Sequence, residues 1–251
     1  MIKINYHHHL NNSGFGNKLF LNFFARALSI ETQQPLFNWM HTKIYPIEKD
    51  YCKGVQGIEK DNWNLIWPYV SNDGEDMTII GKNNNIGQLY GNEYHQNCKV
   101  IKLVSKYKDC LIKNFGDEDG LFIHVRLGDL AKDRRWLHTC NYEYYERCLS
   151  NIDCDKRYLA SDSPHHPLVN KLMSKFDLQP CKKTPEETII FGSRFRNKIL
   201  SLGTFSWWIG FVGSQYNVMC PNPSERGGWH GRIFECMQNW NMVSNSHEKN
   251  N

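Results

Sequence analysis

The chain has 251 residues, of which 40% are apolar, 22% are charged and 13% are aromatic, and its net charge is +4. This length and apolar content allow one large domain or two small ones. Lysines and arginines are scattered rather than clustered, which argues against a nucleic-acid surface, and no apolar run approaches the ~20 residues of a membrane-spanning helix.

The nine cysteines are odd in number and form no C-x-x-C pair. This pattern predicts neither a zinc site nor a disulfide framework, and reduced thiols in a reducing compartment are the simplest interpretation. The N-terminus has no basic-then-apolar signal pattern. We therefore expect a soluble, cytoplasmic protein.

The first half of the chain contains few regular elements. We expect a strand at 1–6, a helix at 17–30, a strand at 35–40 and a helix at 94–115. Residues 41–93 are rich in Gly, Asn and Asp and have poor periodicity, so we expect an irregular, partly helical insertion there. A helix stop at 114–120 predicts a domain boundary, with one domain at 1–115 and another at 116–251.

A glycine turn joins the first strand to the first helix. The turn contains Gly14 and Gly16 and resembles part of a dinucleotide fingerprint, although the third glycine is missing. Gly16 would let a ligand approach the backbone, and Asn17 would either hydrogen-bond a sugar or phosphate or cap the helix.

An apolar run at 121–125 predicts a buried strand that delivers charged residues at its end. His124, Arg126 and Asp129 lie in or just beyond this run. A ligand is expected beyond the carboxyl end of such a strand, and the planar guanidinium of Arg126 suits a phosphate. The alternative is a structural pair of Arg126 with Asp129 that closes a turn.

The second half alternates strands with helices more regularly. We expect strands at 156–161, 178–181, 198–202 and 216–221, and helices at 142–151, 166–176, 185–194, 204–212 and 233–243. Such alternation indicates βαβ crossovers and a parallel sheet, and therefore an α/β fold.

The helix at 204–212 begins directly after a strand that ends in Gly203. Thr204 is a good N-cap residue, and the amides of the first turn, with Phe205 and Ser206, would face the same crevice as Arg126. A pyrophosphate between a helix N-terminus and an arginine is chemically well matched. Trp207 and Trp208 should belong to the core beneath that turn.

Three separated stretches resemble the motifs of the fucosyltransferase superfamily, especially the bacterial α1,2-fucosyltransferases. The chain has Gly14-Phe-Gly16-Asn17 where the family has G-x-G-N, and His124-Val-Arg126-Leu127-Gly-Asp129 where the family has H-x-R-R-x-D. It also has Ser201-Leu-Gly203-Thr204-Phe-Ser206-Trp-Trp, which is similar to N-S-S-F-S-W-W. The second arginine of the central motif is Leu127 here.

The resemblance implies a GT-B-like fold with two Rossmann-like lobes, an N-terminal acceptor lobe and a C-terminal nucleotide-sugar lobe. It implies an inverting glycosyltransferase that moves L-fucose from GDP-fucose to a glycan hydroxyl. His124 would line the nucleotide pocket, and Asp162 would read the guanine edge unless it caps the following helix. The aromatic residues Trp63, Trp67 and Tyr69 would be candidates for sugar stacking, or would pack in the core.

An inverting transfer needs a base for the acceptor hydroxyl. Asp129 and Asp133 lie just beyond the central strand, and the α1,6 relatives favour Asp133; Glu143 is a third candidate. We expect no metal, because Arg126 and a helix N-terminus can neutralise a diphosphate. Asp153 and Asp155 form a D-x-D pair, but they precede a strand instead of following one.

Two alternatives stay open at this point. Leu127 leaves room for another nucleotide sugar on the same scaffold, for example a UDP-pentose such as UDP-xylose. A catalytically inactive module that binds a glycan or a nucleotide is the other alternative. Arg134 and Arg135 would supply the phosphate contact that Leu127 cannot make, or would simply be exposed.

Overall fold

The computed structural model divides the chain into two compact units, Met1–Lys113 and Asn114–Asn251, two residues before the boundary expected from the sequence. It describes the following residues: 2–4, 14–32, 36–37, 42–44, 77–79, 98–128, 139–150, 152–225 and 232–246. Trp63, Trp67 and Tyr69 lie outside these ranges, and so do Asp129 and Asp133.

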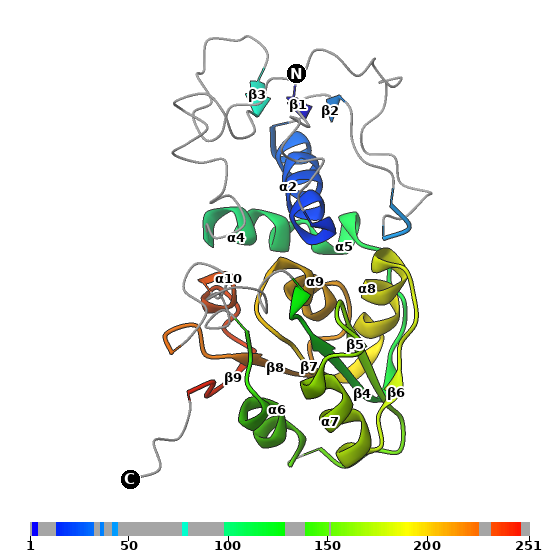
Figure 1. Ribbon diagram of the computed structural model, residues 1–251. Helices are drawn as coiled ribbons and strands as arrows, with labels where there is room; N and C mark the ends of the chain where they lie inside the picture. The colour runs from blue at the N-terminus through cyan, green and yellow to red at the C-terminus, as the bar shows by residue number, and fades with distance from the viewer. Residues whose placement is uncertain are drawn as a thin grey trace. The chain divides into compact units, whose positions relative to one another are not determined.

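The first unit contains a small parallel sheet and an amphipathic helix. Strand β1 (Ile2–Ile4) pairs in parallel with β2 (Leu36–Phe37) and with β3 (Met77–Ile79), in the order β2-β1-β3. Helix α2 (Phe15–Thr32) follows β1, and helices α4 (Cys98–Lys106) and α5 (Lys108–Leu111) complete the unit (Figure 1).

The sequence predicts α2 because its apolar residues recur at helical spacing. Six described apolar residues of the helix are fully buried: Leu19, Phe20, Phe23, Phe24, Ala25 and Ala27. The helix begins at Phe15, two residues earlier than expected, so Asn17 is its third residue and the N-cap role considered for it is wrong. The long helix expected at 94–115 is interrupted at Tyr107 between α4 and α5.

The second unit is a six-stranded, entirely parallel sheet. Its strands are β4 (Glu118–Val125), β5 (Arg157–Ser161), β6 (Gln179–Pro180), β7 (Phe195–Ile199), β8 (Asn217–Pro221) and β9 (Asn241–Val243). Their order across the sheet is β6-β5-β4-β7-β8-β9. This is the Rossmann strand order. Strands β5 and β6 lie on one side of β4, and β7, β8 and β9 lie on its other side. The expected α/β class with a parallel sheet is confirmed.

Helices connect these strands and cover both faces of the sheet (Figure 1). They are α6 (Tyr142–Leu149), α7 (Pro167–Phe176), α8 (Pro185–Ser193), α9 (Thr204–Val212) and α10 (Arg232–Glu235). Local sequence sets their ends. Asn141 caps α6 by accepting from the Tyr144 amide, and Thr184 forms a capping box with Glu187 at the start of α8.

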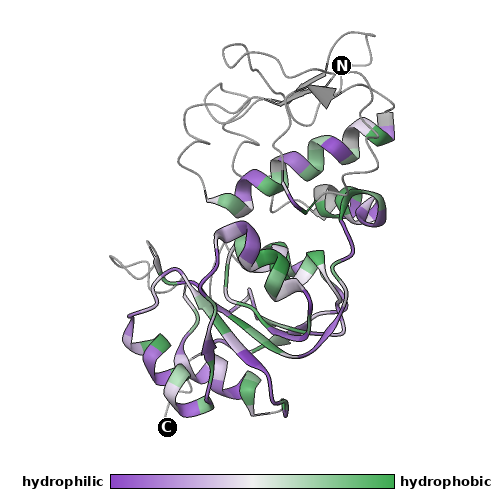
Figure 2. Ribbon diagram, turned by 90° about the vertical axis from the view of Figure 1, so that its right-hand side faces the viewer, coloured by the Kyte–Doolittle hydropathy of each residue, from purple (hydrophilic) through white to green (hydrophobic). Residues whose placement is uncertain are grey.

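Helix α9 is the hydrophobic helix of this unit (Figure 2). Eight of its nine residues are buried, and the rings of Trp207 and Trp208 pack edge to face with centroids 5.0 Å apart. Both tryptophans are fully buried, which confirms that they belong to the core. The helix therefore has a fixed position at the sheet, and its N-terminus is equally fixed.

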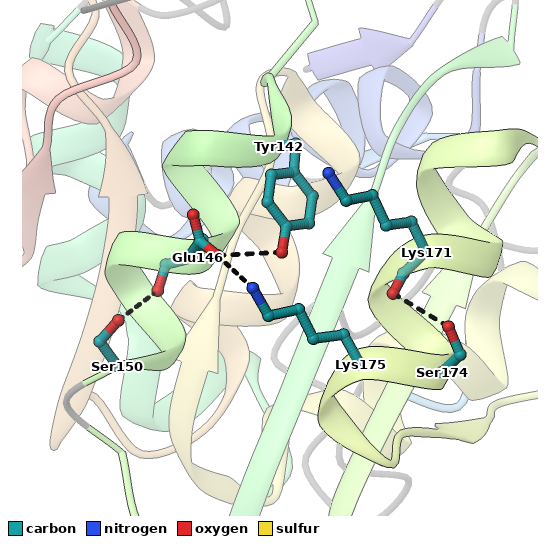
Figure 3. Close-up of polar contacts among 6 residues, drawn as sticks. All are labelled: Tyr142, Glu146, Ser150, Lys171, Ser174 and Lys175. Atoms are coloured by element: carbon teal, nitrogen blue, oxygen red, sulfur yellow. Dashed lines mark hydrogen bonds and ion pairs between the residues drawn. The ribbon is translucent and has the colours of Figure 1, made fainter.

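A polar cluster joins α6 to α7 (Figure 3). Tyr142 Oη donates to Glu146 Oε1 at 3.0 Å, Lys175 Nζ donates to the same oxygen at 2.6 Å, and Lys171 Nζ lies 3.5 Å from the centre of the Tyr142 ring. The hydrogen bonds from Lys175 and Tyr142 lower the pKa of Glu146. Because the cluster is exposed, we assign it only a small part of the stability.

The end of the chain differs from expectation. Apolar residues at helical spacing predict a helix at 233–243, but α10 ends at Glu235 and β9 continues the sheet beside β8. The strand expected at 198–202 begins earlier, at Phe195. In both places the parallel pairing with a neighbouring strand outweighs the secondary structure that the local sequence favours.

Six cysteines of the described residues are free, whereas Cys236 is disulfide-bonded. The expectation that all thiols are reduced is therefore wrong at Cys236. In the described part of the chain, no helix combines the length and the apolar character needed to cross a membrane.

Candidate functional site

Most of the residues selected from the sequence meet at the carboxyl edge of the second unit's sheet. Strand β4 lies between β5 and β7, so the segments that follow these three strands are neighbours. The sheet reverses its order between β4 and β7, and ligands of open α/β sheets bind in the crevice at such a reversal. The site is therefore expected at the ends of β4 and β7.

Asp162 organises the turn that follows β4. Its Oδ1 accepts from the Leu127 amide at 2.8 Å and from the Gly128 amide at 3.1 Å. The Gly128 amide also reaches Ser163 Oγ at 3.1 Å. A Cβ on Gly128, where φ is +29°, would lie 2.5 Å from Asp162 Oδ2, so the turn requires glycine. His166 caps α7, so the alternative role of Asp162 as the cap of that helix is wrong.

Leu127 stands where the H-x-R-R-x-D motif that this stretch resembles has its second arginine. Its side chain is only 3% exposed, and its backbone amide is held by Asp162. The side chain thus belongs to the core, and this stretch offers one arginine, Arg126, at the end of β4.

Arg126 lies against Gly203 at the start of α9. A Cβ built on Gly203 would be 2.8 Å from Arg126 Nη1 and 3.5 Å from Arg126 Cδ. Gly203 has φ +103° and is itself the N-cap, with no side-chain capping bond, and Thr204 is the first helical residue. The expected capping role of Thr204 is therefore wrong. A guanidinium and a helix N-terminus, with its partial charge of about +0.5, together favour an anion.

The buried His124 ring is held by side chains that follow β7. Its Nδ1 is 2.5 Å from Ser206 Oγ and 3.2 Å from Ser201 Oγ. Its ring packs against Phe205 with centroids 4.9 Å apart. Burial, and secondarily the positive charge of Arg126, lowers the pKa of His124 to about 3, so the ring is neutral at physiological pH.

Two tyrosines of α6 support the same strand ends. Tyr144 Oη donates to the Leu200 carbonyl at 2.6 Å, and Tyr145 Oη donates to the His124 carbonyl at 3.5 Å. Burial raises the pKa of both phenols well above the ordinary value, so they act as neutral donors. They fix the backbone from which His124 and the β7 segment project.

The structure thus brings together the following predicted residues: His124, Arg126, Asp162, Gly203, Thr204, Phe205 and Ser206. Gly16 and Asn17 belong to the first unit, in the first turn of α2. Asp153 and Asp155 precede β5, at the opposite end of that strand, and Asp153 lies 3.7 Å from Arg157 in an exposed ion pair. Within the described ranges, no three His, Cys, Asp or Glu side chains gather as a metal site.

Ser201 is the site residue that sequence reasoning missed. It is fully buried, and its Oγ accepts from the Arg126 amide at 3.1 Å. The signal that points to it is the pair of serines at 201 and 206 on either side of the glycine that starts α9.

Comparison of the chain with protein-family models, with curated protein sequences and with solved structures finds no match.

Proposed function

We propose that this protein is an inverting glycosyltransferase that moves a sugar from a nucleotide-sugar donor to a glycan hydroxyl. The observation that carries the proposal is the position of Arg126 against Gly203 at the N-terminus of α9, where the sheet order reverses. This arrangement suits the diphosphate of a donor, which has to be stabilised as it leaves.

The donor assigned in this proposal is GDP-fucose, by resemblance to the fucosyltransferase superfamily. Two contacts support this assignment: His124 bonds Ser206 of α9, and Arg126 lies against Gly203 at the start of the same helix. A UDP-sugar is the second candidate donor, because Leu127 departs from the motif. Its side chain is buried and cannot contact a phosphate as a second arginine would.

The reaction is a single displacement at the anomeric carbon. The acceptor oxygen forms the new glycosidic bond while the bond to the donor's diphosphate breaks, and the acceptor proton passes to a carboxylate. Asp133 is our first choice for this base, with Asp129 as the second. Arg126 and the amides of α9 take up the charge that develops on the leaving diphosphate, so the proposed reaction needs no metal ion.

In this proposal the two units are the lobes of a GT-B-like enzyme. The second unit carries the donor, and the first unit carries the acceptor side. The parallel order β2-β1-β3 and the β1-α2-β2 connection of the first unit are compatible with a second Rossmann-like lobe. Gly16 and Asn17 then lie at the start of a helix that follows a strand, where a sugar or phosphate is accommodated.

Thermal unfolding in the presence of GDP, UDP, GDP-fucose and UDP-xylose tests the donor. We expect GDP and GDP-fucose to raise the melting temperature, since a ligand that binds only the folded state stabilises it. Stabilisation by UDP but not GDP would replace the fucose assignment by the second donor. Saturable binding without release of nucleoside diphosphate in the presence of glycans would identify an inactive binding module instead.

A further inference from the structure

Two serines bond the His124 ring from one side. Ser206 Oγ and Ser201 Oγ both approach Nδ1, and the two hydroxyl oxygens are 2.9 Å apart. Both serines are fully buried, and His124 is 5% exposed. Within the described part of the chain, all the hydrogen bonds of this imidazole are made by Nδ1.

The protons of this group can be arranged in two ways, because a neutral imidazole has one N–H and one bare nitrogen. In the first arrangement Nδ1 is bare, Ser206 donates to it, and Ser201 donates to Ser206. In the second, Nδ1–H donates to Ser206 and Ser206 donates to Ser201. Ser201 then donates to the neighbouring Tyr145 hydroxyl. In both, Ser201 accepts from the Arg126 amide and Ser206 accepts from the Ser201 amide, at 3.1 and 3.2 Å.

The shortest contact favours the first arrangement. Hydroxyl donors make shorter hydrogen bonds than N–H donors, with modes of about 2.7–2.8 Å against about 2.9–3.0 Å. The 2.5 Å separation of Ser206 Oγ and His124 Nδ1 is nearer to the shorter range of hydroxyl donors, which favours the hydroxyl as the donor. This arrangement also uses both hydroxyl protons within the three-residue group.

We propose that Ser201 and Ser206 are positioning residues that fix His124 in its Nε2–H tautomer, so that Nε2–H donates to an acceptor oxygen of the bound nucleoside diphosphate. The identity of this ligand rests on the proposed function, whereas the tautomer does not. In this form His124 has no lone pair on Nε2, and Nδ1 faces the serines. His124 is then a hydrogen-bond donor to the donor substrate and is excluded as the base of the reaction.

Nitrogen NMR of the full-length chain labelled with ¹⁵N-histidine reads the tautomer directly. The protein has 11 histidines, and the His124 signals are those that disappear in His124→Gln. We expect a protonated Nε2 and a bare Nδ1 in the wild type, and a shift of the Nε2 signal when GDP is added. Ser206→Ala should give a mixture of tautomers and about tenfold weaker GDP binding.

Ser193→Ala is the matched control. Ser193 is also fully buried in this unit, but its hydroxyl donates to the Ile190 carbonyl at 2.9 Å and makes no contact with His124. It should leave both the tautomer and the GDP affinity unchanged. Should Ser206→Ala fail to fold, the wild-type spectrum alone still decides the tautomer.

A protonated Nδ1 in the wild type would overturn the inference. A Ser206→Ala protein that keeps both the tautomer and the GDP affinity would overturn the positioning role. An Nε2 signal that does not respond to GDP at a concentration that stabilises the fold would overturn the donor role of His124. An Nε2–H spectrum in a protein that GDP does not stabilise supports the tautomer and contradicts the proposed donor instead.

Discussion

Replacement of Gly203 by alanine perturbs the candidate site through a single methyl group. Gly203 has φ +103° and ψ 166°, a region that only glycine adopts readily. Forcing another residue into such a conformation costs about 1–3 kcal/mol, so we expect the free energy of unfolding of Gly203→Ala to fall by that amount. Denaturant unfolding measures this loss.

The same methyl group would also displace Arg126. The Cβ added at position 203 would lie 2.8 Å from Arg126 Nη1, which is closer than Cβ atoms approach in real structures. The guanidinium therefore has to move away from the α9 N-terminus. A charge-assisted hydrogen bond contributes about 1.5–3 kcal/mol, and its loss should weaken GDP binding about tenfold to a hundredfold. Isothermal titration of the folded variant with GDP measures the affinity.

Gly116→Ala separates the two effects. Gly116 also has a positive φ, +77°, but a Cβ there would meet no atom within 4 Å, and the residue precedes β4 at the opposite end of that strand. This variant should lose stability without losing GDP affinity. Wild-type affinity in Gly203→Ala would refute the assignment of the anion site to Arg126 and α9.

Three further predictions concern the groups around this crevice. Asp162→Asn keeps an acceptor for the two amides of the turn after β4, so its free energy of unfolding should stay near that of the wild type. Asp162→Ala should lose about 1–2 kcal/mol in denaturant unfolding. Equal losses in the two variants would contradict the anchoring role of Asp162. Asp133→Asn should abolish kcat and keep donor affinity, whereas Asp129→Asn should weaken both kcat and donor affinity. Donor-binding isotherms distinguish the two variants. The opposite pattern would make Asp129 the base instead of Asp133. The folded pKa of His124, about 3, lies below its ordinary value of 6.5, so between these values the unfolded chain binds the extra proton and stability falls with falling pH. The loss should reach about 1.4 kcal/mol per pH unit and be absent in His124→Gln, and equal slopes in the two proteins would contradict the burial of a neutral ring.

Local sequence was enough to predict the elements that build the site. The apolar run at 121–125 predicts β4, and the glycine before an apolar helix predicts α9, because strand preference and helix-start signals act over a few residues. The end of the chain is different. β9 exists because it pairs with β8, and the helical spacing of Ile233, Phe234, Met237 and Trp240 does not contain that information.

The details of the site depend on contacts that are distant in the sequence. Ser201 bonds His124, 77 residues away, and this contact follows only from the adjacency of β4 and β7. Asp162 holds the turn after β4 across 35 residues. The cap of α9 is Gly203 instead of Thr204, because a backbone at φ +103° leaves room for Arg126.

We propose that the segments at the ends of β4 and β7 bind a nucleotide-sugar donor for transfer. The most direct measurement is the release of GDP from GDP-fucose, with and without a mixture of glycans, by the wild type and by Arg126→Ala. Arg196→Ala is the control, since Arg196 lies on β7 in an exposed ion pair with Asp119 at 2.8 Å. We expect acceptor-dependent release by the wild type and by Arg196→Ala, and a kcat/KM about a hundredfold lower for a folded Arg126→Ala. Nearly normal turnover by folded Arg126→Ala, or no acceptor-dependent release by the wild type from GDP-fucose or from UDP-sugars, would contradict the claim.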